Sequence, residues 1–183
     1  MEEREKMILD KLRDEERKSV MLTGFIRENV YEFLIKQKGF REDEIEVDAP
    51  FDVFSPTTGQ NEQCSVDFIV KVGGLRILAI KCALSALESI ERHVLAFSRV
   101  AGGIPICVVT SSDYSRVLNT DTGELISEEL SAVPDRPSAV AMGKNGEFRP
   151  LPVPEERLRM ERRILLAFNA LNCRLPGACG EGF

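Results

Sequence analysis

The 183-residue chain lacks several features that would assign it to a familiar class of protein. It has no tryptophan and a single histidine, so it cannot form the His-Glu-x-x-His zinc site of a metalloprotease. It contains no Walker loop, no Gly-x-Gly-x-x-Gly and no Gly-x-Ser-x-Gly sequence, which argues against the enzyme families that carry these motifs. No apolar run approaches the roughly 18–20 residues of a membrane helix, because the best candidate, residues 77–84, is short and carries Lys81. We therefore expect a protein that has no membrane partner.

Cysteine pairs and targeting segments are also missing. The five cysteines include no Cys-x-x-Cys, and this odd number predicts reduced thiols in a cytoplasmic protein. Cys173 and Cys179 could form a disulfide or bind a metal, but without a second pair at zinc spacing neither role is favoured. The N-terminus is too acidic and too highly charged for a signal peptide.

Negative charge is in excess, and it is concentrated in one segment. The chain has 24 basic and 30 acidic residues, a formal net charge of −6, which argues against a basic protein that coats nucleic acid. Residues 28–62 hold nine carboxylates and three basic residues, a difference equal to the charge of the whole chain, whereas residues 63–183 are neutral. Any contact with nucleic acid must therefore come from a local patch.

The apolar pattern predicts one α/β domain built on a mixed central β-sheet flanked by helices. Helical spacing covers the first 40 residues up to Gly39, with Phe25, Ile26, Val30, Phe33 and Leu34 as its apolar positions. We treat residues 1–21 as an N-terminal helical extension, 22–136 as the core and 154–173 as a C-terminal helix. The remaining predicted elements are a strand over 45–53 that Pro50 interrupts, strands over 64–72 and 75–83, a helix over 86–101, a strand over 104–110, and short strands at Leu118 and 125–126 within a turn-rich stretch over 111–153.

The turn at Gly73-Gly74 joins two strands whose register can be argued from the sequence. A three-residue turn would place an apolar ladder of Phe68 and Leu78 on one face, whereas a two-residue turn would mix polar and apolar side chains. We prefer the three-residue turn. It puts Asp67 opposite Ala79, with Lys81 diagonal to Asp67 on the same side.

Several segments, in this order and spacing, resemble the PD-(D/E)XK nuclease superfamily, and within it the N-terminal domain of type I restriction enzyme R subunits. The resemblance spans roughly residues 22–136. It rests on residues 26–34 with Gly39-Phe40, the strand 66–70, the segment Ile80-Lys-Cys-Ala, Val108-Val-Thr, and Thr120-Asp-Thr-Gly-Glu-Leu-Ile. It implies a restriction-endonuclease-like fold.

In that family a strand Asp and the Glu of a Glu-x-Lys hold Mg²⁺, and the Lys helps to activate the attacking water. Mg²⁺ prefers carboxylate oxygens and waters, and it neutralises charge on the phosphate during hydrolysis. Asp67 and Lys81 match this pattern as catalytic residues, with Asp67 as the metal ligand, but Ala79 stands at the Glu position and cannot coordinate a metal. His93 and Phe97 stand where related nucleases often carry Gln and Tyr, and His93 is a candidate accessory residue for a phosphate or a metal.

Three hypotheses for function follow. The leading one is a stand-alone, catalytically impaired nuclease-like domain that binds DNA, other subunits of a restriction-modification type, or a second copy of itself. The alternative is an active Mg²⁺-dependent endonuclease with its second acid relocated, to Glu88 or Glu91 on the following helix or to Glu28 on the first helix. The third is a protein-interaction domain that uses the acidic segment 28–62 and has no nucleic-acid contact.

Two sets of charged residues, the Asp67–Lys81 pair and the arginines of the last helix, can also be explained by structural roles alone. Asp67 and Lys81 could form a half-buried ion pair that needs no metal. Arg76, Arg92 and Arg99 are the candidate phosphate contacts, whereas the arginines of the last helix are offset by nearby glutamates and predict a salt-bridged, solvated face.

Overall fold

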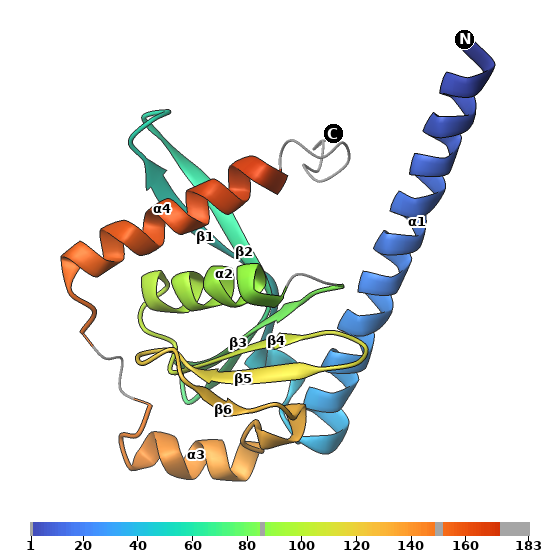
Figure 1. Ribbon diagram of the computed structural model, residues 1–183. Helices are drawn as coiled ribbons and strands as arrows, with labels where there is room; N and C mark the ends of the chain where they lie inside the picture. The colour runs from blue at the N-terminus through green and yellow to red at the C-terminus, as the bar shows by residue number, and fades with distance from the viewer. Residues whose placement is uncertain (1, 85–86, 149–151, 173–183) are drawn as a thin grey trace.

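The computed structural model of the chain describes residues 2–84, 87–148 and 152–172. It is the α/β arrangement that the apolar pattern predicts, with a six-stranded mixed sheet flanked by helices (Figure 1). The helices are α1 (Glu2–Glu32), α2 (Leu87–Val100), α3 (Arg136–Lys144) and α4 (Glu155–Asn172), with short helical turns η1 (Phe33–Gln37), η2 (Glu42–Glu44) and η3 (Leu130–Ala132). The strands are β1 (Ile45–Ser55), β2 (Gln60–Val72), β3 (Leu75–Cys82), β4 (Ile106–Thr110), β5 (Ser115–Asn119) and β6 (Leu125–Ser127).

The strands lie in the sheet in the same order as in the chain. All neighbouring strands are antiparallel except β3 and β4, which are parallel and joined through α2. A parallel pair needs such a crossover because the chain must return to the starting edge of the sheet. The carboxyl ends of β3 and β4 therefore meet at one edge, beside α1.

Each face of the sheet carries its own apolar core. The C-terminal end of α1, together with α3, covers Phe68, Val70, Leu78 and Ile80 on one face. Helices α2 and α4 cover the other, where Val66, Ile69, Ala79 and Val109 are buried with Phe97 and Leu165. Figure 1 shows α2 and α4 stacked on one side of the sheet and α3 on the other. With both faces covered, a side chain that reaches solvent from the sheet must do so at an edge or a strand end.

The predicted register of the β2–β3 hairpin is wrong. The turn has two residues, Gly73 and Gly74, because Val72 pairs with Leu75. A bulge at Ile77 then shifts the pairing, so that Val70 meets Leu78, Phe68 meets Ile80 and Ile69 meets Ala79. The apolar ladder is preserved, since both Ile77 and Leu78 lie in the same core. If the same register continues, Asp67 lies beside Lys81, two residues along β3 from its predicted partner, Ala79.

The strand that Pro50 was predicted to interrupt is continuous from Ile45 to Ser55. Pro50 is tolerated because β1 is an edge strand, where a missing backbone N–H need not break the ladder. The irregular residue is instead Asp48, whose φ of +49° lies in the left-handed region. The pairs Val47–Phe68 and Ala49–Val66 flank it, which leaves Asp48 opposite Asp67.

Two further expectations need correction. The stretch 111–153, predicted to be rich in turns, contains helix α3. Asp135 caps this helix by accepting a hydrogen bond from the backbone N–H of Ser138, and Pro137 lies in its first turn. Phe25, predicted to face the core, is 57% exposed. No helix in the described part of the chain is long and apolar enough to cross a membrane.

Candidate functional site

Asp67 has a buried carboxylate that lies beside the carboxyl end of β3. Its Oδ2 accepts a hydrogen bond from the backbone N–H of Cys82 at 2.7 Å. The ammonium of Lys81 lies 3.3 Å from Oδ2 and 3.4 Å from Oδ1. The guanidinium of Arg27, from α1, lies 3.4 Å from Oδ1. The structure thus brings Asp67 and Lys81 together as an ion pair and adds a second cation.

Arg27 and Asp48 belong to this site although sequence reasoning missed both. Arg27 donates a hydrogen bond to Asp48 Oδ1 at 2.7 Å, and its guanidinium lies 5.8 Å from the centre of the Phe68 ring. The hydrogen bond with Asp48 is the main reason why the pKa of Arg27 is raised further. Pairing β1 with β2 across the turn before Gln60 would have placed Asp48 beside Asp67, so the sequence held a signal for one of the two residues.

The side chains of Asp48, Arg27, Asp67 and Lys81 alternate in charge, so the site has no net charge with which to attract an ion. Asp48, Arg27, Asp67 and Lys81 sum to zero, and each carboxylate contacts at least one cation. Cys82 offers no nucleophile, because burial and the neighbouring Asp67 carboxylate raise the pKa of its thiol to about 12. We call Asp48, Arg27, Asp67 and Lys81 the Asp67 cluster.

Ala79, which was predicted to stand at the Glu position of the nuclease pattern, lies in the core. It is fully buried, with Ile69 beside it on β2 and Cys107 beside it on β4. Both neighbours are themselves buried under α2 and α4. The predicted arrangement, with Ala79 directly opposite Asp67, is therefore incorrect.

None of the three acids proposed as substitutes reaches the Asp67 cluster. Glu91 contacts Arg116 of β5 at 2.6 Å. Glu28 and Glu88 are exposed, on α1 and α2 respectively, and neither makes an ion pair or a side-chain hydrogen bond within the described ranges. Over the same residues no group of three or more His, Cys, Asp or Glu side chains is placed to hold a metal ion.

His93 lies close to the Asp67 cluster but is enclosed by apolar groups. The residue is buried, its ring centre is 5.2 Å from that of Phe168 on α4, and its Nδ1 has no hydrogen-bond partner among the residues described. Burial, together with the nearby charge of Lys81, lowers the pKa of His93 to about 4. Phe97, one turn later, is fully buried in the same core. At neutral pH His93 is therefore an uncharged core residue.

The lowered pKa of His93 predicts a loss of stability in mild acid. The unfolded chain takes up a proton near pH 6.5, whereas the folded chain resists it until about pH 4, so the stabilisation is present above pH 6.5 and is lost as the pH falls towards 4. We expect His93 to account for about 2 kcal/mol of lost unfolding free energy between pH 7 and pH 5. Urea unfolding at both pH values, for the wild type and His93→Leu, measures this share.

Because the chain has one histidine, proton NMR provides a direct check. The imidazole resonance should titrate near pH 4. A midpoint near 6.5, or the same pH dependence of stability in His93→Leu as in the wild type, would contradict the buried environment.

The three arginines proposed as phosphate contacts differ in their availability. Arg76 donates to Glu46 at 3.1 Å. Arg99 is buried in an ion pair with Glu161 at 2.6 Å and also donates to the carbonyl of Thr120 at 2.8 Å. Arg92 is exposed and makes no ion pair in the part of the chain that the structure describes. Of the three, only Arg92 is open to a phosphate.

Five of the nine carboxylates in the acidic segment 28–62 make ion pairs with basic side chains of the described residues. Glu44 makes a bidentate pair with Arg136, and this hydrogen bonding lowers the pKa of Glu44. Glu46 contacts Lys71 as well as Arg76. On α4 the predicted salt-bridged face is confirmed for three arginines: Arg159 and Arg162 contact Glu155, and Arg157 contacts Glu161. Ion pairs within the chain therefore offset part of the acidic excess in the sequence.

Cys173 and Cys179 lie outside the described residues, while Cys64, Cys82 and Cys107 are buried free thiols. Comparisons of the chain with protein-family models, with curated proteins and with solved structures give no significant match.

Proposed function

We propose that this chain is a restriction-endonuclease-like domain, similar to the N-terminal module of type I restriction enzyme R subunits, that has lost hydrolysis and acts by binding a partner. One observation carries the proposal. Asp67, the carboxylate at the metal-ligand position, is occupied by a backbone N–H and two cations instead of being open to a metal.

The residues of the Asp67 cluster do not fit Mg²⁺. The ion needs several oxygen ligands with near-octahedral geometry, normally from one or two carboxylates and waters. Here Arg27 and Lys81 bracket Asp67, and their positive charges oppose a divalent cation at that point. The other carboxylate, Asp48, is turned to Arg27. We therefore derive no hydrolytic step through a metal.

The same contacts give the cluster a structural role. Asp67 joins β2 to the end of β3 through Cys82 and Lys81, and joins both strands to α1 through Arg27. The buried carboxylate of Asp67 is stabilised because these partners supply the hydrogen bonds and opposite charges that it loses on leaving water. The cluster therefore serves to attach α1 to the sheet.

Binding of DNA by this domain is expected to be weak. Two of the three candidate arginines are held by glutamates of the same chain, and the net charge of −6 opposes approach to a polyanion. We place the domain in the cytoplasm as a partner subunit, since the cysteines of the described part of the chain are free thiols.

A cleavage assay tests the proposal. We expect the wild type, incubated with plasmid or single-stranded DNA and Mg²⁺ or Mn²⁺, to give no cleavage above that of Asp67→Asn. Asp52→Asn, on the same sheet but exposed, is the matched control. Fluorescence anisotropy with a short duplex should give a dissociation constant no tighter than about 10⁻⁴–10⁻⁶ M at physiological salt, the range of non-specific binding.

Metal-dependent cleavage that Asp67→Asn abolishes and Asp52→Asn retains would overturn the impaired-enzyme proposal. It would favour the alternative of an active endonuclease with a relocated acid.

A further inference from the structure

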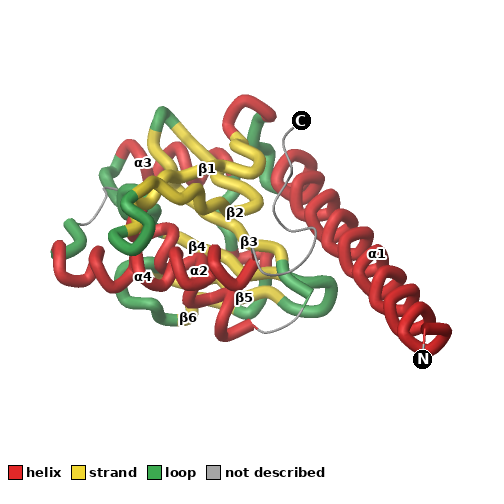
Figure 2. Tube along the Cα trace, turned by 90° about the horizontal axis from the view of Figure 1, so that it is seen from above, coloured by secondary structure: helices red, strands yellow, loops and turns green. Residues whose placement is uncertain are grey.

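The N-terminal half of α1 stands clear of the rest of the molecule. Figures 1 and 2 show the helix running well past the edge of the sheet. Every side chain from Asp10 to Leu22 is exposed, and the helix enters the core only from Ile26 onward. Isolated helices of about 12–15 residues are marginal in water, and most helices in proteins are stabilised by packing of one face. The side chains from Asp10 to Leu22 lack such packing against the other residues that the structure describes.

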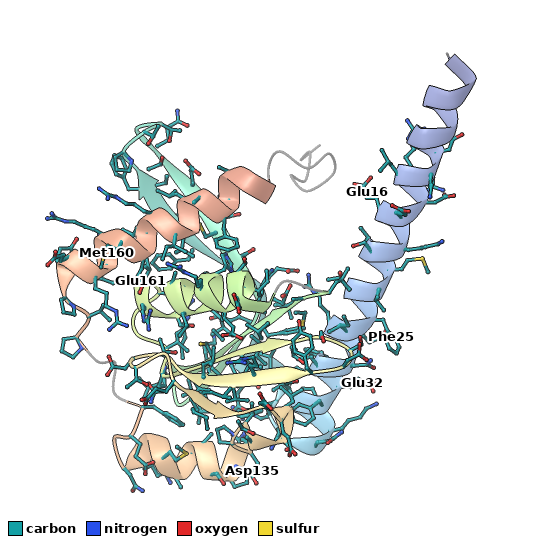
Figure 3. The ribbon with its side chains drawn as sticks, viewed as in Figure 1. Glu16, Phe25, Glu32, Asp135, Met160 and Glu161 are labelled. Carbon is teal, nitrogen blue, oxygen red and sulfur yellow. The ribbon has the colours of Figure 1, made fainter. Side chains whose placement is uncertain are left out.

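An apolar patch lies on the outer side of the same helix. Met21 is 75% exposed, Phe25 is 57% exposed, and Leu22 is exposed beside them. Figure 3 shows Phe25 on the side of α1 turned away from the sheet. Ile26 and Val30 occupy the opposite, buried side. Three large apolar side chains together on a solvent face suggest an interaction surface.

The charges that flank this patch are arranged symmetrically about Phe25. Asp14 and Lys18 precede it by 11 and 7 residues, and Glu32 and Lys36 follow it by 7 and 11. At 100° per residue all five lie within a sector of about 40° on the helix. Lys36, in the wider turn η1, contacts Glu32 at 2.8 Å and so stays on this face. All four charged side chains are exposed.

The signs of these charges decide which partner fits. An antiparallel second copy centred on Phe25 would place Lys18 opposite Glu32 and Asp14 opposite Lys36, twice over. A parallel copy would instead bring like charges together, which is unfavourable. In the antiparallel arrangement the free half of each helix lies along the anchored half of the other, and the two sheets stay on opposite sides.

We propose that the chain forms an antiparallel homodimer through the outer face of α1, with Phe25 of the two copies in contact at the two-fold axis. Met21 and Leu22 extend the apolar centre. The pairs Lys18–Glu32 and Asp14–Lys36 form its rim and fix its register.

Sedimentation of the full chain over a range of concentrations tests the dimer. We expect a monomer–dimer equilibrium. Phe25→Glu should raise the dissociation constant at least about 100-fold, because the substitution places a carboxylate in both halves of the central contact. Val20→Glu is the matched control: Val20 is equally exposed, but it lies on a different side of the helix, so its effect should stay within about threefold. Circular dichroism checks that both variants keep the fold.

A charge exchange distinguishes a second copy from any other occupant. Lys18→Glu and Glu32→Lys should each weaken the homodimer about tenfold, because each creates two like-charge pairs. Mixing the two variants should restore wild-type affinity in a heterodimer, since every rim pair is then again opposite in sign. A wild type that is monomeric at all concentrations, a Phe25→Glu variant that dimerises as well as Val20→Glu, or a mixture no tighter than its components would each overturn the proposal.

Discussion

Ala79→Glu, which restores the acid that the nuclease family carries at this position, is expected to destabilise the fold by about 3–5 kcal/mol and to give no cleavage of DNA. Ala79 is fully buried, and Ile69 and Cys107 flank it in the sheet. A carboxylate there would be desolvated, and Lys81, the nearest cation on that face, already contacts Asp67. Urea unfolding measures the loss of stability, and a plasmid assay with Mg²⁺ measures cleavage.

Ala79→Gln separates volume from charge. It adds nearly the same side chain without ionisation, so it should lose only the overpacking part, about 1–3 kcal/mol. The folded-state pKa of a glutamate at position 79 would be raised by burial, so the extra penalty of Glu over Gln should shrink as the pH falls. A stable Ala79→Glu variant that cleaves DNA with Mg²⁺ would show that the site geometry is intact and that one side chain alone was lost.

Arg99→Met is expected to cost about 3–5 kcal/mol of unfolding free energy, because it leaves the buried carboxylate of Glu161 with only its longer contact to Arg157, at 3.6 Å. The side chains of Arg99 and Glu161 are only 10% and 7% exposed, and their contact is 2.6 Å. Arg99 also donates to the carbonyls of Thr120 and Asp121. It thus joins α2, α4 and the turn after β5, and its replacement would remove the side-chain donor to the Thr120 carbonyl and the short contact to Glu161.

Arg92→Met is the matched control, since Arg92 lies on the same helix but is exposed and should change stability by less than about 0.5 kcal/mol. In the double variant Arg99→Met/Glu161→Leu most of the loss should be recovered, because an apolar pair of similar volume commonly replaces a buried ion pair without net cost. Equal stability of Arg99→Met and Arg92→Met in urea unfolding would contradict a structural role for Arg99.

The two predictions concern Ala79 and Arg99, which the sequence analysis placed in or near a nuclease-like site. Ala79, which the resemblance to the nucleases places at their Glu position, lies in the core under α2 and α4, and Arg99, a candidate phosphate contact, links those two helices. Neither residue offers an accessible polar group, which the proposed hydrolysis would need, because Ala79 is fully buried and Arg99 is held by Glu161. The proposed loss of hydrolysis therefore rests on several contacts as well as on the missing carboxylate.

Local patterns in the sequence predicted much of the secondary structure. The apolar spacing of the first 40 residues and the stop at Gly39, which has a φ of +73°, are confirmed, as are the helix that begins after Pro154 and the mixed sheet. Such features depend on neighbours within a few residues, so they can be read from a short window. The proximity of Asp67 to Lys81 also followed from sequence, because the preferred register placed the two residues diagonally on the same side of the hairpin.

What the sequence by itself determined is thus the order of the elements, the mixed sheet and the absence of a Glu at position 79. Only the tertiary structure decided the bulge at Ile77, the placement of Arg27 and Asp48 around Asp67, and the pairing of Arg99 with Glu161. These contacts join residues 21 to 62 positions apart, or depend on how two strands pack against both cores at once. No local pattern encodes such a choice, because it is the burial of the whole sheet that makes one register and one set of ion pairs more stable than the others.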